Sequence, residues 1–211
     1  MKTLLRPLGL LALVLGLALV FAGADAQPAD LKGLVAQLQK GGHVIVFRHG
    51  ATNRDQADTD PLNPENIGKQ RLLSDKGREV ARQVGAALRK LGIPLGAVYT
   101  SKFNRAVETG KLVSGRDVVA LIDITEGGLV VTPIENDRRA GAFRTLAGTP
   151  PPAGTNVLIV SHKPNIIDAF GKDWFDVREG EASVFKPDGA GKAVVVGRVQ
   201  AVDWIKAAEG Q

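Results

Sequence analysis

Cysteine is absent from the 211 residues of the chain, and histidine occurs only three times. The lack of cysteine excludes disulfide bonds, thiolate catalysis, cysteine-based zinc sites and a lipid anchor on an N-terminal cysteine. Aromatic residues make up only 5% of the chain, and it contains no dense basic tract with interleaved aromatic side chains. Nucleic acid is therefore not an expected partner, although the formal net charge is +5. A mildly basic surface accounts for this charge, which also suits a small anionic substrate.

The N-terminal segment differs in composition from the rest of the chain. Two cationic residues precede an apolar run over residues 8–21, and residues 24–26 (Ala-Asp-Ala) match a signal-peptidase cleavage site. We expect a signal peptide over 1–26, and hence a periplasmic or secreted protein without stable membrane association after cleavage. A retained membrane anchor is the alternative, but the run is short for a membrane span. The remaining residues, 27–211, have a globular composition and no internal repeat, which predicts a single domain.

Beyond this segment, stretches with helical periodicity alternate with short apolar runs. The alternation predicts a three-layer α/β fold, in which helices cover both faces of a mostly parallel central sheet. Helices are expected over 30–40, 74–91 and 134–146, after the serine at 101, and from about residue 165. Strands are expected over 43–47, 95–100, 118–122, 156–161, 181–186 and 193–199, the last two as an antiparallel closing hairpin.

Single residues predict finer features of these elements. Asp30, Ser74 and Ser101 are expected to cap the N-termini of the helices that follow them. Residues 203–211 are expected to form a frayed tail. Three arginines of the fourth predicted helix are expected on its solvated surface: Arg138, Arg139 and Arg144.

The strand over 43–47 is followed by Arg48, His49 and Gly50. In an open α/β sheet, reactive groups lie just beyond the carboxyl ends of the strands. Arginine offers a planar set of donors that suits a phosphate group, and a neutral imidazole is a nucleophile that can form a covalent intermediate. Glycine allows an anion to approach backbone N–H groups. This pattern predicts a phosphate site with a histidine nucleophile, whereas His43, at the start of the strand, is expected to be structural.

Two further residues occupy comparable positions. Arg105 lies about one turn into the helix that follows the strand over 95–100, near the helix end where anions bind. His162 directly follows the strand over 156–161. Because the carboxyl ends of parallel strands meet at one edge of the sheet, we expect both side chains to face Arg48 and His49.

Residues 51–73 are polar and are expected to form a long loop over this site. Its candidate ligand groups are Asn53, Arg54, Gln70 and Arg71, and a solvated loop residue is the alternative for each. Asn53 is the candidate that we place with the substrate-binding residues.

Four motifs resemble those of a known family and follow one another in the same order: R-H-G at 48–50, L-S-x-x-G-R at 73–78, S-x-x-x-R-A-x-E-T at 101–109 and V-S-H at 160–162. The chain resembles the histidine phosphatase superfamily, with the phosphoglycerate-mutase-like fold, and in particular its small secreted bacterial branch. The resemblance implies a two-step hydrolysis of a small phosphorylated substrate. His49 attacks phosphorus and water then releases phosphate, while Arg48, Arg105 and His162 hold the phosphate oxygens. No metal or other cofactor is implied.

The general acid for the leaving group is less defined by the sequence. Glu126 follows the third predicted strand, where the mutase-like branch has its acid, but the surrounding sequence matches that branch poorly. Glu181, before the closing hairpin, and Asp168, beyond His162, are the other candidates. Lys163 stands where the acid-phosphatase branch has its aspartate. Absence of a dedicated acid would suit phosphohistidine or an anhydride, whose leaving groups need no proton.

Three other functions remain open at this stage. A mutase on the same fold would need a phosphoenzyme shielded from water, and a secretory signal argues against a glycolytic role. A phosphate-recognising binding module would keep the pocket without turnover. A zinc or binuclear hydrolase is disfavoured because the chain has no cysteine and no H-x-H pair.

Overall fold

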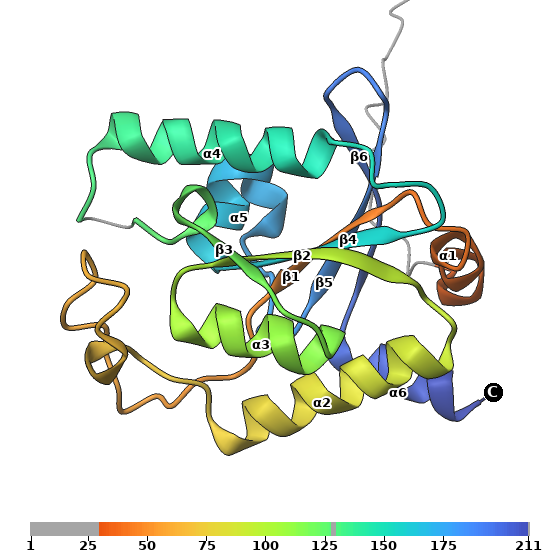
Figure 1. Ribbon diagram of the computed structural model, residues 1–211, viewed down its shortest axis with the longest axis horizontal. Helices are drawn as coiled ribbons and strands as arrows, with labels where there is room; N and C mark the ends of the chain where they lie inside the picture. The colour runs from red at the N-terminus through yellow and green to blue at the C-terminus, as the bar shows by residue number, and fades with distance from the viewer. Residues whose placement is uncertain (1–29, 128–129, 211) are drawn as a thin grey trace, which may run out of the picture.

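The computed structural model describes residues 30–127 and 130–210, which are arranged around a six-stranded sheet of order β3-β2-β4-β1-β5-β6 (Figure 1). The strands are β1 (Val44–Arg48), β2 (Leu95–Ser101), β3 (Val119–Leu121), β4 (Asn156–Ser161), β5 (Ala182–Pro187) and β6 (Ala193–Val199). The first four run parallel to one another. β5 and β6 form an antiparallel hairpin, and β5 pairs antiparallel with β1. The predicted mostly parallel sheet and its closing hairpin are confirmed.

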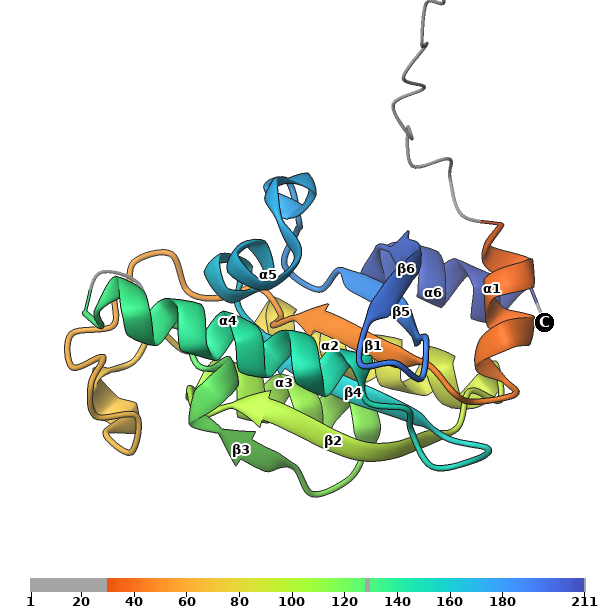
Figure 2. The same ribbon diagram turned by 90° about the horizontal axis from the view of Figure 1, so that it is seen from above.

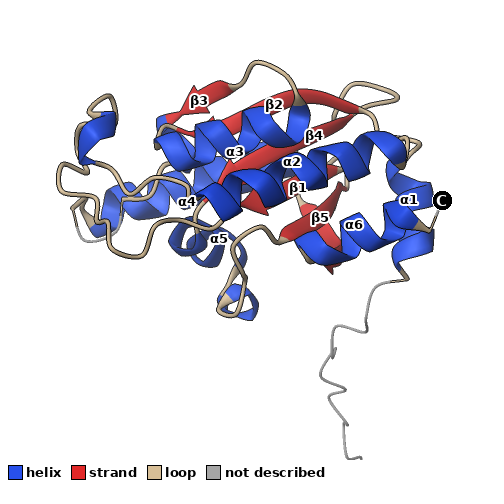
Figure 3. Ribbon diagram, turned by 90° about the horizontal axis from the view of Figure 1, so that it is seen from below, coloured by secondary structure: helices blue, strands red, loops and turns tan. Residues whose placement is uncertain are grey.

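Helices cover both faces of this sheet, as predicted. They are α1 (Leu31–Leu38), α2 (Asp75–Lys90), α3 (Asn104–Ser114), α4 (Pro133–Gly148), α5 (Lys163–Phe170) and α6 (Ala201–Glu209). Short 3₁₀ turns lie at Ile67–Lys69, Ile122–Ile124 and Lys172–Trp174. α4 and α5 lie on one face, and α2, α3 and α6 lie on the other (Figures 1 and 3).

The alternation of side chains along β1 divides the core into two layers. Ile45 and Phe47 belong to the cluster formed with α1, α2, α3 and α6, whereas Val44 and Val46 belong to the cluster formed with α4 and α5. All four side chains are buried because the strand lies inside the sheet and is covered on both faces. This burial explains the continuous apolar run in the sequence.

Two of the three predicted helix caps are confirmed. The side chain of Asp30 accepts a hydrogen bond from the backbone N–H of Gly33, and Ser74 accepts one from that of Gly77. The prediction for Ser101 is wrong, because the N-cap of α3 is Phe103. The Ser101 hydroxyl accepts the Phe103 N–H and lies against His162 instead.

Two surface predictions are also wrong. Residues 201–209 form helix α6 rather than part of a frayed tail, and Trp204, which is 1% exposed, joins the core beneath α2. Arg139 is buried, unlike Arg138, because its guanidinium donates to Thr125 O and to Glu135. Hydrogen bonds to these acceptors compensate for the burial of its charge.

No helix in the ranges 30–127 and 130–210 is long and apolar enough to cross a membrane. The predicted signal peptide over 1–26 lies outside the residues that the structure describes.

Candidate active site

The register of the parallel strands brings two histidines together. β1 and β4 pair with Arg48 opposite Ser161, so that His49 and His162, the next residues, lie side by side beyond the strand ends. Their ring centroids are 5.1 Å apart. The neighbouring strand β2 leads into α3, which carries Arg105. The strands β1 and β2 end on the same side of the molecule (Figure 2), and His49, Arg105 and His162 meet at this edge of the sheet, as predicted.

His49 is held as a neutral imidazole with one ring nitrogen available. Its Nδ1 lies 2.8 Å from Gly50 O, an acceptor, so Nδ1 carries the proton and Nε2 keeps its lone pair. Burial, and then the positive charge of Arg105, lower the pKa of His49 to about 3. A histidine in this state is a nucleophile at neutral pH.

Gly50 is required for packing rather than for contact with an anion. Its N–H donates to Thr109 Oγ1 at 3.1 Å, so the expectation that this N–H faces a bound anion is not met. A β-carbon at this position would lie 3.1 Å from Gly77 O, which is tight. Thr109 also donates to Arg105 O at 2.6 Å. This threonine thus ties the segment after β1 to the helix that carries Arg105.

Arg48 presents an unsatisfied donor in the same region. Its Nη1 donates to Val177 O at 2.8 Å, and its Nη2 lies 3.7 Å from a Glu179 oxygen. The Nε–H group is buried and has no hydrogen-bond partner. Burial lowers the pKa of Arg48, although Glu179 opposes the shift. A buried cationic donor without an acceptor is favourably placed to bind an anion.

Arg105 is fully buried and holds the centre of a polar network. Its Nε–H points to His162 Nδ1 at 3.3 Å. Nη1 donates to Asp58 at 2.9 Å, and Nη2 donates to Glu126 at 3.1 Å. The face of Phe103 lies 4.5 Å from the guanidinium carbon. The guanidinium is therefore pre-positioned by its neighbours, and an incoming phosphate would compete with two carboxylates for its donors.

His162 is buried and neutral, because burial and then the charge of Arg105 hold its pKa well below the ordinary value. Its Nε2 lies 2.6 Å from Ser101 Oγ. Since Nδ1 receives the Arg105 donor, the neutral ring carries its proton on Nε2 and donates to the serine. The Nδ1 edge faces Glu126 Oε2 at 3.5 Å.

A cavity of about 450 Å³ opens on this cluster. It is lined by Arg48, His49, Arg71, Glu126, His162, Lys163, Pro164, Ile167 and Asp168. Its volume lies in the range of small-molecule sites. Two of the three candidate acids, Glu126 and Asp168, thus reach the cavity, and burial followed by Asp137 raises the pKa of Asp168.

Other candidates lie elsewhere. Glu181 is 1% exposed, and its carboxylate accepts hydrogen bonds from Arg198 and Gln200, so it does not face the cavity. The Asn53 amide donates to Leu73 O at 3.5 Å and does not line the cavity.

Most of the remaining candidates do not line the cavity. Arg54 is exposed and does not line the cavity, and Gln70 supports the backbone by accepting from Asn104 N–H and donating to Pro64 O. Of the four loop candidates, only Arg71 lines the cavity. His43, predicted to be structural, is buried with Nδ1 against Gly41 O at 3.0 Å.

Asp58 is a site residue that sequence reasoning missed. One carboxylate oxygen accepts from both Arg71 N and Arg105 Nη1, each at 2.9 Å. It comes from the irregular loop, where no periodicity marks one aspartate among several. The only feature of the sequence that points to an acidic site residue is the number of acidic residues in this loop before Arg105.

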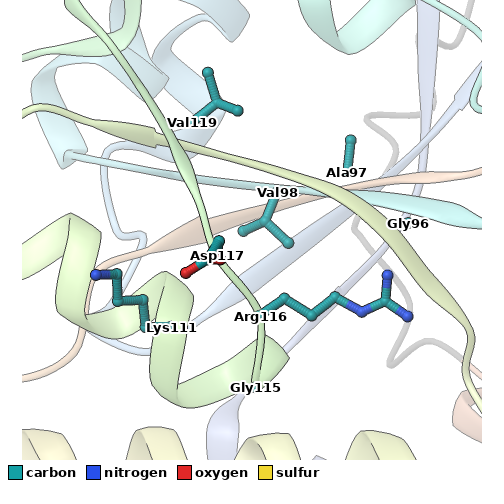
Figure 4. A pocket seen from close by; sticks show the side chains of 8 residues that line it. All are labelled: Gly96, Ala97, Val98, Lys111, Gly115, Arg116, Asp117 and Val119. Carbon is teal, nitrogen blue, oxygen red and sulfur yellow. The ribbon is translucent and has the colours of Figure 1, made fainter.

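Three other cavities among the described residues lack this combination of groups. One of about 660 Å³ lies between β2, α3 and β3, and its polar lining consists of Lys111, Arg116 and Asp117 (Figure 4). No group of three or more His, Asp or Glu side chains able to hold a metal ion occurs among the described residues.

Comparisons with known proteins agree with the fold. Residues 40–127 match the family model of the histidine phosphatase superfamily, branch 1. The matched segment includes Arg48, His49, Arg105 and Glu126, but His162 lies beyond it. No protein with a curated description matches the sequence.

Three of the solved structures with the same fold are described as phosphatases. The protein histidine phosphatase SixA, complexed with tungstate, is 20% identical with a TM-score of 0.52, and the match covers 76% of this chain and 97% of that one. A mycobacterial glucosyl-3-phosphoglycerate phosphatase with inorganic phosphate is 16% identical (TM-score 0.53; 76% and 99% covered). Phosphoserine phosphatase from Entamoeba histolytica with 3-phosphoglyceric acid is 14% identical (TM-score 0.51; 76% and 98% covered). These likenesses establish the phosphoglycerate-mutase-like α/β fold.

Proposed function

We propose that this chain belongs to the histidine phosphatase superfamily and hydrolyses phosphomonoesters through a phosphohistidine intermediate on His49. The observation that carries the proposal is the state of this imidazole: it is neutral, its Nδ1 is fixed on Gly50 O, and it lines a cavity beside Arg48 and His162. The match of residues 40–127 to the family model supports the same conclusion.

In the first step, Nε2 of His49 attacks phosphorus as the bond to the leaving oxygen breaks. Negative charge on the transferring group is held by Arg48, whose buried Nε–H is unpaired, and by Arg105. His162 contributes a third donor once its proton moves to Nδ1. The Ser101 hydroxyl allows this change, because a hydroxyl donates as readily as it accepts. Water then attacks the phosphohistidine, and inorganic phosphate and neutral His49 result.

Glu126 is the general acid in this proposal. Its carboxyl oxygen lies 3.1 Å from Arg105 Nη2, where it occupies a donor that phosphate needs. A phosphate dianion displaces Glu126 from this donor, which frees the carboxyl group to carry the proton for the leaving oxygen. The protonated acid donates to the leaving oxygen, and the resulting carboxylate takes a proton from the attacking water.

The placement of Glu126 in the cavity favours ordinary phosphomonoesters as substrates. The alternative is a phosphatase that has no dedicated acid and acts on phosphohistidine or anhydrides. The placement of Glu126 also favours turnover over a module that only binds phosphate. The reaction uses protein side chains at every step, so we expect it to proceed in the presence of a chelator.

Hydrolysis of p-nitrophenyl phosphate by residues 27–211, with chelator present, tests the proposal. We expect phosphate release by the wild type and a loss of at least about a hundredfold in His49→Ala. Glu181→Gln, whose carboxylate lies outside the cavity, is the control and should keep most of the activity. Residual activity above a few per cent in His49→Ala contradicts the covalent mechanism.

We also propose that the protein is exported and that residues 1–26 are removed. N-terminal sequencing of the protein purified from its native host should begin at Gln27. An intact N-terminus or a cytoplasmic location contradicts this part of the proposal.

A further inference from the structure

The cavity contains two cations that the proposed chemistry does not use. Arg71 and Lys163 both line it. Among the described residues, no hydrogen bond or ion pair engages the Arg71 guanidinium or the Lys163 ammonium group. By contrast, Arg48 lies against Glu179, and Arg105 is paired with Asp58 and Glu126.

The backbone of Arg71 is fixed beside the phosphate site. Its N–H donates to Asp58 at 2.9 Å, and its carbonyl oxygen accepts from Arg105 Nη1 at 3.4 Å. Its positive charge contributes to the lowered pKa values of both His49 and His162, which places the guanidinium within electrostatic reach of the reacting groups. The loop therefore presents a free cation at a defined place in the cavity.

Lys163 directly follows His162, at the first turn of α5. Its ammonium group lies 4.4 Å from the ring centroid of Phe175, a side chain that is 71% exposed. A cation over an exposed aromatic ring is held by only about 0.5–1 kcal/mol, so an anion can draw it away. Lys163 thus adds a second cation that is free to turn toward a ligand.

We propose that the substrate carries a second anionic group, a carboxylate or another phosphate, and that Arg71 and Lys163 bind it while Arg48 and Arg105 hold the transferred phosphate. This inference rests on the proposed function. The cavity of about 450 Å³ has room for such a molecule.

The acidic residues of the cavity do not cancel this preference. Glu126 is already paired with Arg105, and Asp168 is the other carboxylate in the lining. The cations Arg48, Arg71 and Lys163 outnumber the two carboxylates, even before Arg105 behind them is counted.

A matched set of esters tests the inference. Glycerol 1-phosphate has a hydroxymethyl group where 3-phosphoglycerate has a carboxylate, and glycerol 1,3-bisphosphate carries a second phosphate. We expect the wild type to have a kcat/KM at least about tenfold higher for 3-phosphoglycerate or for glycerol 1,3-bisphosphate than for glycerol 1-phosphate. Whichever ester shows the larger preference identifies the second anion.

The double variant Arg71→Gln/Lys163→Gln should lose this preference, because kcat/KM falls at least about tenfold more for the favoured ester than for glycerol 1-phosphate. Lys111→Gln/Arg116→Gln is the matched control, because both residues lie in the cavity of Figure 4, away from the site, and this double variant also removes two positive charges without touching the substrate. The control should leave the preference unchanged.

The outcomes separate the two proposals. Hydrolysis that depends on His49 but shows no preference in the wild type, or an equal loss for all esters in the double variant, overturns the inference and leaves the proposed function intact. Absence of any hydrolysis that depends on His49 overturns the proposed function and the inference with it.

Discussion

Glu126→Gln separates the chemistry of Glu126 from its structural role. The glutamine has the same shape, and its amide oxygen can still accept from Arg105 Nη2, where the carboxylate oxygen now lies at 3.1 Å. The side chain is 27% exposed, and the buried guanidinium of Arg105 keeps Asp58 as its carboxylate partner. The variant should therefore fold, with its cavity intact, while lacking a transferable proton.

The size of the catalytic effect depends on the leaving group. A general acid contributes about 10²–10⁴ in rate when the leaving alcohol is weakly acidic, which corresponds to about 3–5 kcal/mol of transition-state stabilisation. An acidic phenol leaves without a proton. We therefore expect kcat/KM for alkyl phosphates to fall about a hundredfold or more in Glu126→Gln, and that for p-nitrophenyl phosphate to fall less than about tenfold.

The assay is a series of phosphomonoesters whose leaving groups span a range of acidity, with Asp168→Asn as the matched control. The logarithm of kcat/KM should depend weakly on leaving-group acidity in the wild type and Asp168→Asn, and steeply in Glu126→Gln. Parallel plots for the wild type and Glu126→Gln would refute Glu126 as the acid. A steep plot for Asp168→Asn instead would assign the proton to Asp168.

Three further predictions concern charge, pH and packing. Arg105→Ala should lower kcat/KM at least about a hundredfold, because it removes a fully buried cation from the site. The control Arg82→Ala, at an exposed arginine, should change kcat/KM little. A loss below tenfold in Arg105→Ala contradicts the proposed role of Arg105. Unfolding returns the pKa of His49 from about 3 to about 6.5, so the unfolded chain binds an extra proton in that window and stability falls as pH falls below 6.5. Protonation of this histidine in the unfolded chain should lower the free energy of unfolding by about 1.6 kcal/mol between pH 6.5 and 5, as measured by urea unfolding. The pH dependence should be smaller in His49→Ala, and identical slopes contradict the assignment. Trp204→Ala should destabilise the fold by about 3–5 kcal/mol, against less than about 1 kcal/mol for the half-exposed Val202→Ala, and equal effects would show that α6 is not part of the core.

The loop over 51–73 is coupled to Arg105 by one carboxylate. Asp58 accepts from Arg71 N and from Arg105 Nη1, so the loop conformation and the position of Arg105 depend on each other. Gln70 adds a second link, because it accepts from Asn104 N–H, the first residue of α3. A change in this loop therefore alters both the cavity wall, through Arg71, and the position of Arg105.

The sheet and the placement of the main site residues could be predicted from the sequence because the signals are local. Apolar runs that are buried on both faces define β1 and β4, and the parallel register then places His49 and His162 together. The same logic places Arg105 one turn beyond β2. Strand ends in a parallel sheet are a small set of positions, so functional residue types at several of them are informative.

The sequence predictions were wrong where tertiary contacts determine whether a segment or side chain is buried. Helix α6 has apolar residues at helical spacing, but this short segment does not show by itself that it packs on the core, as Trp204 does in the cluster that α2 also joins. Arg139 is buried because Thr125 O and Glu135 accept its donors, and Glu181 is removed from the site by Arg198. Such pairings join residues far apart in sequence or satisfy buried groups in one specific geometry, and neither property shows in periodicity.

The most direct test of the account is to trap the phosphoenzyme. The wild type, mixed with a phosphomonoester and quenched within the first turnover, should carry one phosphoryl group on His49, labile to acid and stable to base, and located by mass spectrometry of the peptide that contains residues 43–53. His49→Ala should carry none, while Glu126→Gln should still accumulate it from p-nitrophenyl phosphate, because this leaving group needs no acid. Turnover by the wild type with no trapped phosphate, or with phosphate on His162 instead, would contradict His49 as the nucleophile.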